Sequence, residues 1–244
     1  MPPRRAEGRA ADEPRPFALE TGFTRNAEGS VLVTSGRTRI ICTASLEERV
    51  PAWRRGSGQG WITAEYGMLP RATHTRSVRE ATAGKASGRS LEIQRLIGRS
   101  LRSVVDLSVL GETTVWIDCD VIEADGGTRT AAIAGGFVAL VLALRDLAGR
   151  RAFARPPVSG YVSSVSVGWV DGQPLLDLDY EEDARAEVDL NVVMNERLDV
   201  IEVQGTAEGR PFPRSALDAM LDRAEIGIRQ RIAAQQAALG GRLL

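Results

Sequence analysis

Two adjacent glycines near the middle of the chain constrain the fold more than any other feature. Gly126 and Gly127 separate a strand-type run, residues 113–122, from a long apolar helical pattern, residues 131–147. Glycine enters the backbone conformations of such a turn without the strain that a side chain causes. The first N–H groups of the following helix have no intrahelical partner, and Arg129 adds a guanidinium that can hold phosphate with two parallel hydrogen bonds. The sequence therefore predicts a phosphate site at this turn.

The order of the expected elements predicts a mixed α+β protein with two roughly similar halves, rather than a regular alternation of strand and helix. Alternating apolar residues indicate the strands, and an apolar period of 3.6 residues indicates the helices. Hairpin turns are expected at Gly36 and at Asp171 with Gly172. Residues 47–87 follow neither pattern and are expected to be irregular. The expected strands are 17–24, 30–33, 38–45, 113–122, 160–170, 174–178, 188–194 and 199–204, and the expected helices are 90–105, 130–147 and 215–239.

The N-terminal segment and the two cysteines indicate the cellular compartment of the protein. Residues 1–14, rich in proline, arginine and alanine, are expected to form a flexible N-terminal arm ahead of a single domain over 15–244. The arm lacks the apolar core of a signal peptide, and no apolar stretch is expected to approach the roughly 20 residues of a membrane helix. Cys42 and Cys119 lie in strand-type runs, which favours reduced thiols. We expect a cytoplasmic protein without membrane contact.

The histidine count excludes several kinds of active site. His74 is the only histidine of the chain, and the two cysteines lie far apart in the sequence. A zinc site needs a cluster of such ligands, which this chain lacks. Serine or cysteine nucleophiles that depend on a Ser-His-Asp or Cys-His arrangement are therefore not expected to drive its chemistry.

Charge is distributed unevenly along the chain, although its net value is only −1. Residues 49–89 carry eight basic and two acidic side chains, whereas residues 171–202 carry eleven acidic and two basic ones. A basic stretch combined with an acidic one suits a polyanionic substrate processed at a metal site. Solvated surface segments are the alternative. The same choice holds for Arg95, Arg99 and Arg102 on the expected helix 90–105, which either face solvent or form a wall for RNA.

Seven carboxylates crowd the thirteen residues 177–189. They would repel one another unless a positive group lies among them. Magnesium is the natural candidate, because it takes hard oxygen ligands and often uses one or two carboxylates with substrate phosphates. An acidic turn in solvent is the alternative. Asp189 favours a function, because it begins an apolar run in which an unpaired carboxylate is costly to bury.

Six blocks of sequence, in this order, resemble ribonuclease PH, and the resemblance runs from about residue 15 to the final helix. It implies one catalytic domain over 15–244 with an α+β fold related to a ribosomal-protein domain. That fold has two pseudo-repeated halves, in which mixed and antiparallel sheets are flanked by helices. The blocks are 60–70, 88–89, 92–97, 118–121, 124–130 and 202–208.

The activity implied by this resemblance is 3′-to-5′ phosphorolysis of RNA. Inorganic phosphate is the co-substrate and nucleophile, nucleoside diphosphates are released, and the substrates are the 3′ ends of tRNA precursors and other structured RNAs. A magnesium ion and a homohexamer built as a trimer of dimers are implied as well. A metal-dependent hydrolase that uses water, and a non-catalytic RNA-binding ring subunit, are the two rival functions.

The resemblance also assigns roles to individual residues. Asp183 and Asp189 match the catalytic carboxylates that associate with the metal, and for Asp183 the roles of metal ligand and general acid both stay open. The residues that match the phosphate site are Arg89, Gly127, Thr128 and Arg129, and those that match the tRNA-binding residues are Arg71, Arg76 and Arg79.

Overall fold

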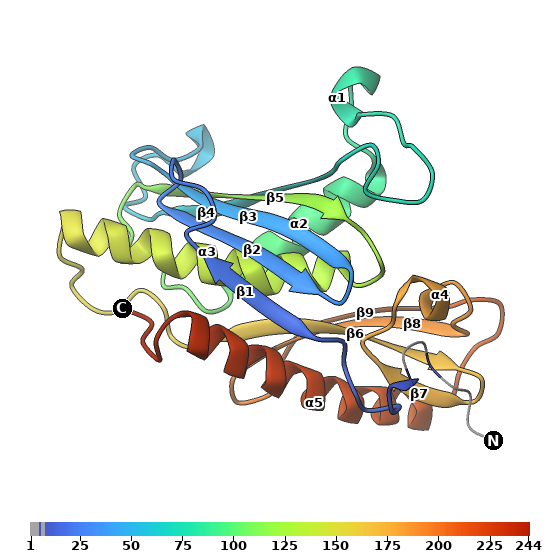
Figure 1. The fold of residues 1–244 in the computed structure, drawn as a ribbon. Coiled ribbons are helices and arrows are strands. Elements are labelled where there is room, and N and C mark those ends of the chain that lie inside the picture. The colour runs from blue at the N-terminus through green and yellow to red at the C-terminus, as the bar shows by residue number, and fades with distance from the viewer. Residues whose placement is uncertain (1–4, 6–7) are drawn as a thin grey trace.

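The chain forms two β-sheets with long helices packed between and below them (Figure 1). The computed structural model describes residue 5 and residues 8–244. One sheet has five strands in the order β1-β2-β3-β5-β4, and the other has four in the order β7-β6-β8-β9. Helix α3 lies between the two sheets, and α5 covers the outer face of the second sheet (Figure 1). The α+β architecture with two halves predicted from the sequence is confirmed.

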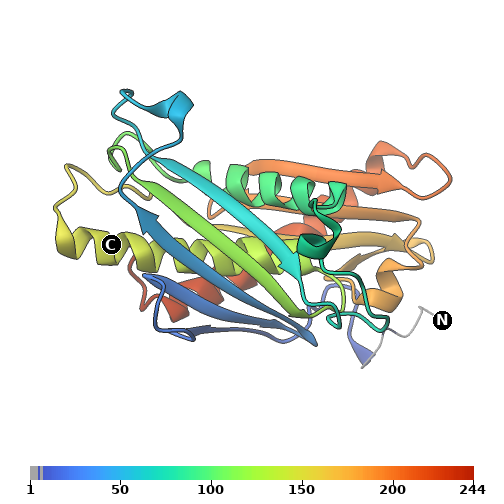
Figure 2. The same cartoon turned by 90° about the horizontal axis from the view of Figure 1, so that it is seen from above.

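The first half contains five strands and three helices. Figure 2 shows β5 between β3 and β4, with α2 running beside β4. The only parallel pair of this sheet joins β4 to β5, and its other pairs are antiparallel. The elements are β1 (Phe17–Thr21), β2 (Gly29–Ser35), β3 (Thr38–Glu47), β4 (Trp61–Met68), α1 (Glu80–Ala83), α2 (Gly88–Arg102), β5 (Thr114–Glu123) and α3 (Thr128–Arg150), with a short 3-10 turn at Ala52–Arg54.

The second half is an antiparallel sheet that ends in the long C-terminal helix. Its first hairpin turns at Asp171 and Gly172, which adopt φ angles of 50° and 80°, as a two-residue hairpin turn requires. The elements are β6 (Val162–Val170), β7 (Gln173–Leu176), α4 (Tyr180–Asp183), β8 (Val188–Asn195), β9 (Val200–Ala207) and α5 (Arg214–Ala238). The predicted hairpin, the predicted strand pair after it and the predicted final helix are all confirmed.

The prediction that residues 47–87 are irregular is wrong at β4. This strand pairs with β5 over its whole length, from Trp61 opposite Thr114 to Met68 opposite Val121. Its residues Ile62, Ala64 and Tyr66 are buried, while the residues between them face the other side. The alternation is therefore visible in the sequence, but it is short, and glycines close to both ends make the segment resemble a loop.

Helix α3 is the centre of the core. Side chains from both sheets and from α2 and α5 form one continuous apolar cluster around it, and Phe137, Leu140 and Leu144 are fully buried. By length and composition α3 is apolar enough to cross a membrane, contrary to the expectation that no stretch approaches that length. However, 78% of its most apolar window is buried inside the protein, as in the core helix of a folded domain.

The N-terminal segment lies against the second half of the protein, although a flexible arm was expected over residues 1–14. Arg5 is only 5% exposed, and its guanidinium donates to both carboxylate oxygens of Glu182 at 2.7 and 2.8 Å. Arg9 reaches the same carboxylate at 3.2 Å. The expectation is thus wrong for residue 5 and residues 8–14, because buried ion pairs hold them; residues 1–4 and 6–7 lie outside the described residues.

Candidate active site

The two glycines before α3 both adopt left-handed backbone conformations. Their φ angles are 79° at Gly126 and 65° at Gly127, which caps the helix. A Cβ atom on Gly126 would lie 2.6 Å from the carbonyl oxygen of Leu178, and one on Gly127 would lie 2.9 Å from the Arg15 guanidinium. Only glycine fits both positions. The turn therefore brings its backbone close to the second half of the protein at the point where α3 begins.

The first two residues of α3 are held by side chains from other elements. Thr128 is buried, and its hydroxyl oxygen accepts a hydrogen bond of 2.8 Å from the hydroxyl of Tyr66 on β4. The Arg129 Nη1 donates to Oε1 of Glu92 on α2 at 3.3 Å and to Oε1 of Gln204 on β9 at 3.2 Å. These contacts direct Arg129 between the two halves of the protein.

A second helix start lies close to the same region. Helix α2 begins at Gly88, and the side chain of Ser87 caps it by accepting from the Ser90 N–H at 3.0 Å. Arg89 is the second residue of this helix and is exposed. The partial positive charge of a helix N-terminus and the guanidinium of Arg89 together favour an anion.

The two predicted catalytic carboxylates come from the second half. Asp183 is the last residue of α4, a single turn closed by a capping box between Asp179 and Glu182. Asp189 is the second residue of β8, where it is half-buried and accepts a long hydrogen bond of 3.4 Å from the Asn191 amide. No arginine or lysine forms an ion pair with Asp189 among the described residues.

The pKa values of these carboxylates show that the groups share one electrostatic environment. Burial raises the pKa of Asp189 to about 6, and the negative charge of Asp183 contributes to the rise, while Arg129 and Arg89 oppose it. Burial also raises the pKa of the Asp183 carboxyl, again against Arg89 and Arg129. Two carboxylates and two guanidiniums from four separate elements therefore act on one another. Such a cluster of perturbed acids is typical of functional sites.

A pocket of about 530 Å³ connects the guanidinium of Arg129 with the carboxylate of Asp189. Residues of β8 and β9 line it, together with one residue of α2 and one of α3. The lining residues are Glu92, Arg129, Asp189, Asn191, Val203, Gln204, Gly205 and Thr206.

The donor set of this site fits a magnesium ion with few protein ligands. Within the described residues no group of three or more histidine, cysteine or acidic side chains converges as a metal cage. Asp183 and Asp189 supply only two carboxylates. Magnesium commonly binds through one or two carboxylates together with waters and substrate phosphates, so that two carboxylates suffice.

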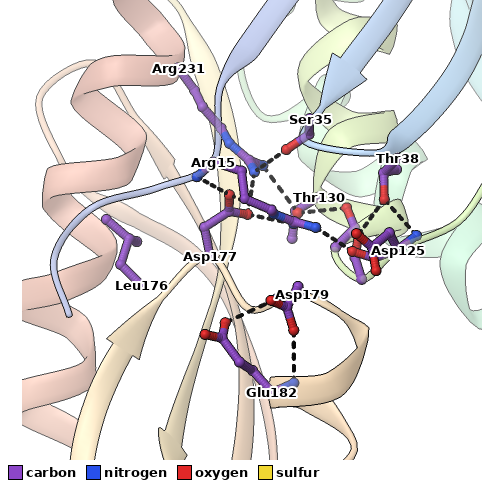
Figure 3. A network of polar contacts seen from close by, with 12 residues as sticks. Arg15, Ser35, Thr38, Asp125, Thr130, Leu176, Asp177, Asp179, Glu182 and Arg231 are labelled. Atoms are coloured by element: carbon purple, nitrogen blue, oxygen red, sulfur yellow. Dashed lines mark hydrogen bonds and ion pairs between the residues drawn. The ribbon is translucent and has the colours of Figure 1, made fainter. Parts of the chain in front are cut away.

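Most of the other acids in the crowded segment 177–189 are neutralised by arginines. Asp177 pairs with Arg15 at 2.8 Å and with Arg231 at 2.9 Å (Figure 3). Glu182 pairs with the N-terminal arginines described above. The interpretation of the whole segment as a magnesium site is thus wrong for these acids, because the compensating positive charge comes from residues far away in the sequence.

The basic loop between β4 and α1 lies next to the acidic turn. The ring of His74 lies 5.7 Å from the ring of Tyr180 on α4, centroid to centroid. Arg71, Arg76 and Arg79 are exposed, and Arg71 donates to the carbonyl of His74 at 2.9 Å. The loop therefore places exposed basic residues beside α4, the helix that carries Asp183.

The arginine stripe of α2 divides between several environments. Arg95 is exposed, whereas Arg99 forms a two-pronged ion pair with Glu202 on β9. Arg102 stacks over the ring of Trp61 at 4.4 Å and donates to the carbonyl of Ile62 at 2.7 Å. Neither a fully solvated face nor a continuous wall for RNA describes this stripe.

Sequence reasoning missed several residues of the site. Tyr66, Glu92 and Gln204 lie within the blocks that carry the resemblance, but nothing local indicates that they contact Thr128 or Arg129. Asn191 carries the strongest signal, since it lies two residues from Asp189 on the same face of β8. Nothing in the sequence around Arg15 indicates that its guanidinium lies next to Gly127 and pairs with Asp177.

Comparison with protein families decides the relationship. Domain 1 of the 3′ exoribonuclease family, also called the RNase PH family, matches residues 13–145, and domain 2 of the same family matches residues 160–227. The chain belongs to the 3′ exoribonuclease family. The boundary between the two domains falls between α3 and β6, whereas the apolar core crosses it without interruption. The resemblance seen in the sequence is thereby confirmed.

Solved structures show the same RNase PH fold. The crystal structure of rice (Oryza sativa) Rrp46 matches with a TM-score of 0.77 and 18% identity, over 96% of this chain and 100% of that one. An Archaeoglobus fulgidus exosome with RNA bound to the active site matches with a TM-score of 0.78 and 23% identity, over 93% and 91% of the two chains. An archaeal exosome core matches with a TM-score of 0.74 and 22% identity, over 97% and 91%.

Proposed function

We propose that this protein is a phosphorolytic 3′-to-5′ exoribonuclease that trims the 3′ ends of tRNA precursors and other structured RNAs. Inorganic phosphate is its nucleophile, nucleoside diphosphates are its products, and a magnesium ion assists. The observation that carries the proposal is the pocket in which Arg129 at the start of α3 faces Asp189 on β8. A group that binds anions and an acid thus line the same cavity, and family membership supports the reaction class.

The phosphate side of the pocket binds and orients the nucleophile. The N–H groups at the start of α3, the Thr128 hydroxyl and the guanidiniums of Arg129 and Arg89 provide donors and positive charge for one anion. Glu92 and Gln204 hold the Arg129 guanidinium in place. Orientation of this kind converts an encounter in solution into a reaction between neighbouring groups, which is a large part of catalysis in phosphoryl transfer.

The chemical step exchanges one phosphorus–oxygen bond for another. An oxygen of the bound phosphate attacks the phosphorus of the terminal phosphodiester, and the bond to the 3′ oxygen of the shortened RNA breaks. That oxygen takes up a proton, for which Asp183 with its raised pKa is a candidate donor. In the alternative role of Asp183, as an ionised ligand that binds magnesium together with Asp189, the metal would supply positive charge to the phosphoryl oxygens and the leaving oxygen. The product is a nucleoside diphosphate, so an excess of diphosphate should drive extension of the RNA.

A tRNA substrate is proposed because of the basic loop. Arg71, Arg76 and Arg79 are exposed on the loop whose His74 contacts Tyr180 of α4, and they suit contacts to phosphates rather than to bases. They suit a folded RNA whose 3′ end enters the pocket while its body lies on the loop. Assembly as a homohexamer, a trimer of dimers, belongs to the same proposal and rests on the resemblance to the family. A cytoplasmic location belongs to it as well and rests on the reduced thiols expected for Cys42 and Cys119.

The decisive assay incubates a tRNA with extra 3′ nucleotides in buffers with and without inorganic phosphate. We expect nucleoside diphosphates that appear only with phosphate. Nucleoside monophosphates in phosphate-free buffer would instead identify a hydrolase. A ring subunit without catalytic activity would release neither product while still binding the RNA. Both rival results contradict the proposal.

The Arg129→Ala variant tests the phosphate side. One charge-assisted pair contributes about 1.5–3 kcal/mol, so the KM for phosphate should rise about 10- to 100-fold. The KM for RNA should change little, because the substitution removes a contact to the nucleophile. Initial rates measured over a series of phosphate concentrations give both values. An unchanged KM for phosphate would remove Arg129 from the phosphate site.

The Arg76→Ala variant tests the basic loop. Because Arg76 is exposed and contacts phosphates in this account, its loss should weaken RNA binding and lower the slope of log K against log salt by about 1. The KM for phosphate should stay as in the wild type. Filter binding at several salt concentrations measures the slope, and Arg229→Ala, at an exposed position on α5, is the matched control. Equal slopes for both variants would show that the loop does not contact RNA.

A further inference from the structure

A buried polar network lies directly behind the glycine turn (Figure 3). Its centre is Asp177, which is fully buried. Arg15 donates to this carboxylate three times, from its backbone N–H at 2.9 Å and from Nε and Nη2 at 3.0 and 2.8 Å. Arg231 on α5 donates to the same group at 2.9 Å. The network thus ties the N-terminal segment to the end of β7 and to α5.

This network continues into the backbone of the turn, where three consecutive carbonyl groups each accept from a side chain. The Asp125 carbonyl accepts from Nη1 of Arg15, and the Gly126 carbonyl accepts from the Thr38 hydroxyl at 2.8 Å. The Gly127 carbonyl accepts from the Thr130 hydroxyl at 2.9 Å. The oxygens that would repel an anion are therefore all engaged by protein side chains.

The opposite side of the turn keeps its N–H groups available. Within the described residues, the N–H groups of Thr128 and Arg129 have no acceptor on the protein. Consecutive free N–H groups in such a turn form a concavity that binds anions. The Thr128 N–H shares its planar peptide unit with the Gly127 carbonyl, which the Thr130 hydroxyl holds. Arg15 and Thr38 hold the two preceding peptide units, and so fix the course of the chain into this one. Arg15 and Thr38 therefore act on the phosphate site without touching phosphate.

The same N-terminal segment also holds the carboxylate side of the site. Arg5 and Arg9 converge on Glu182, and Arg5 donates to the carbonyl of Leu176 at 2.7 Å. Glu182 precedes Asp183 in α4, a helix of only four residues that has little stability of its own. Its position is thus determined by the ion pairs at Glu182 and by its capping box.

We propose that the N-terminal segment, residue 5 together with residues 8–15, positions both halves of the active site. Arg15 orients the glycine turn that receives phosphate, and Arg5 with Arg9 orients α4 and its Asp183. They are positioning residues, not catalytic ones, since each acts through another group. This inference rests on the proposed phosphorolytic function.

The test of the phosphate half uses two independent variants and one rescue. Arg15→Lys keeps the charge but loses the fork that holds Asp177 and the Asp125 carbonyl together. Thr38→Val removes the hydroxyl that holds Gly126 and accepts from the Asp125 N–H at 2.8 Å, with little change in volume. We expect both to raise the KM for phosphate about five- to tenfold, the effect of about one lost hydrogen bond, with kcat and the KM for RNA within twofold. Thr38→Ser should restore the wild-type value.

The test of the carboxylate half uses Arg5→Lys. Lysine keeps a positive charge beside Glu182 but loses the second hydrogen bond to this carboxylate and the bond to the Leu176 carbonyl. We expect kcat to fall about five- to tenfold while the KM for phosphate stays within twofold. The control is Arg223→Lys, because Arg223 contacts the same segment at Asp12 through a partly exposed pair of 3.7 Å. It should leave all constants unchanged.

The kinetic constants of these variants distinguish a segment that positions the active site from one that only stabilises the fold. A purely structural segment would lower the active fraction, so that kcat falls in every variant and the KM for phosphate stays constant; that result would overturn the inference. The inference also fails if Thr38→Ser behaves like Thr38→Val. Failure of the proposed function is seen separately, since the wild-type protein would then release no nucleoside diphosphate in the presence of phosphate.

Discussion

The Asp189→Asn variant is expected to lose about 10²–10³-fold in kcat, because it removes a charge that acts on the reacting phosphoryl group. Asparagine keeps the shape of the side chain and the contact with Asn191 on the same strand. RNA affinity should stay nearly unchanged, since the basic loop is untouched. The expected pattern is thus a protein that binds its substrate and turns it over very slowly.

The same substitution should stabilise the fold at neutral pH. The pKa of Asp189 is raised from an ordinary value of 3.8 to about 6 by burial, so its charged form is disfavoured in the folded protein. Below the pKa that Asp189 has in the unfolded protein, its carboxyl is largely neutral in both states and destabilises the fold least. The folded state loses stability as the pH rises from that value through about 6. At pH 8 the neutral asparagine avoids this cost, and the melting temperature should rise.

Turnover and melting temperature measured together on one preparation test this prediction. Loss of activity with a higher melting temperature excludes unfolding as the cause. The stabilisation should disappear at about pH 4, where the wild-type carboxyl is protonated as well. Activity that survives in Asp189→Asn would show that this carboxylate takes no part in the reaction.

The Asp177→Asn variant is expected to lower the free energy of unfolding by about 3–5 kcal/mol, the effect of breaking a buried ion pair from one side. The guanidiniums of Arg15 and Arg231, both almost fully buried, would lose their shared counter-charge. Burial alone would raise the pKa of Asp177, but Arg231 and Arg15 hold it well below its usual range. The stabilisation is therefore present at neutral pH and is lost only as the pH falls into the strongly acidic range.

Urea titration of the two proteins at pH 7 measures this difference. The matched control is Asp106→Asn, which breaks an exposed pair with Arg155 and should shift the midpoint little. Equal midpoints for Asp177→Asn and the wild type would show that the buried network does not stabilise the fold.

Local sequence patterns were sufficient for most elements of the fold. The hairpin at Gly36, the hairpin at Asp171 and the apolar period of α5 each depend on neighbours in the chain, and each formed as predicted. Strand β4 was missed because it is stabilised by its long-range parallel pairing with β5 rather than by a strong local signal. Long-range pairing of this kind leaves little trace in a short segment.

The site could be predicted only in part, for a similar reason. The glycine turn and Arg129 combine a strand, two glycines and a helix within a few residues, so their chemistry is readable locally. The acids of the segment 177–189 all look alike in the sequence. Only the structure separates Asp177 and Glu182, which pair with arginines, from Asp189 at the pocket and from Asp183, whose charge acts on Asp189. Their partners come from the chain terminus and from α5, which no local pattern links to this turn.

The central claim is that orthophosphate itself attacks the RNA from the cradle at the start of α3. Its most direct test supplies ³²P-labelled orthophosphate with unlabelled tRNA precursor and locates the label in the nucleotide product. The label should appear in the β-phosphate of nucleoside diphosphate, and Arg129→Ala should need much more phosphate to transfer it. Release of unlabelled nucleotides by the wild-type protein in the presence of labelled orthophosphate would contradict the account.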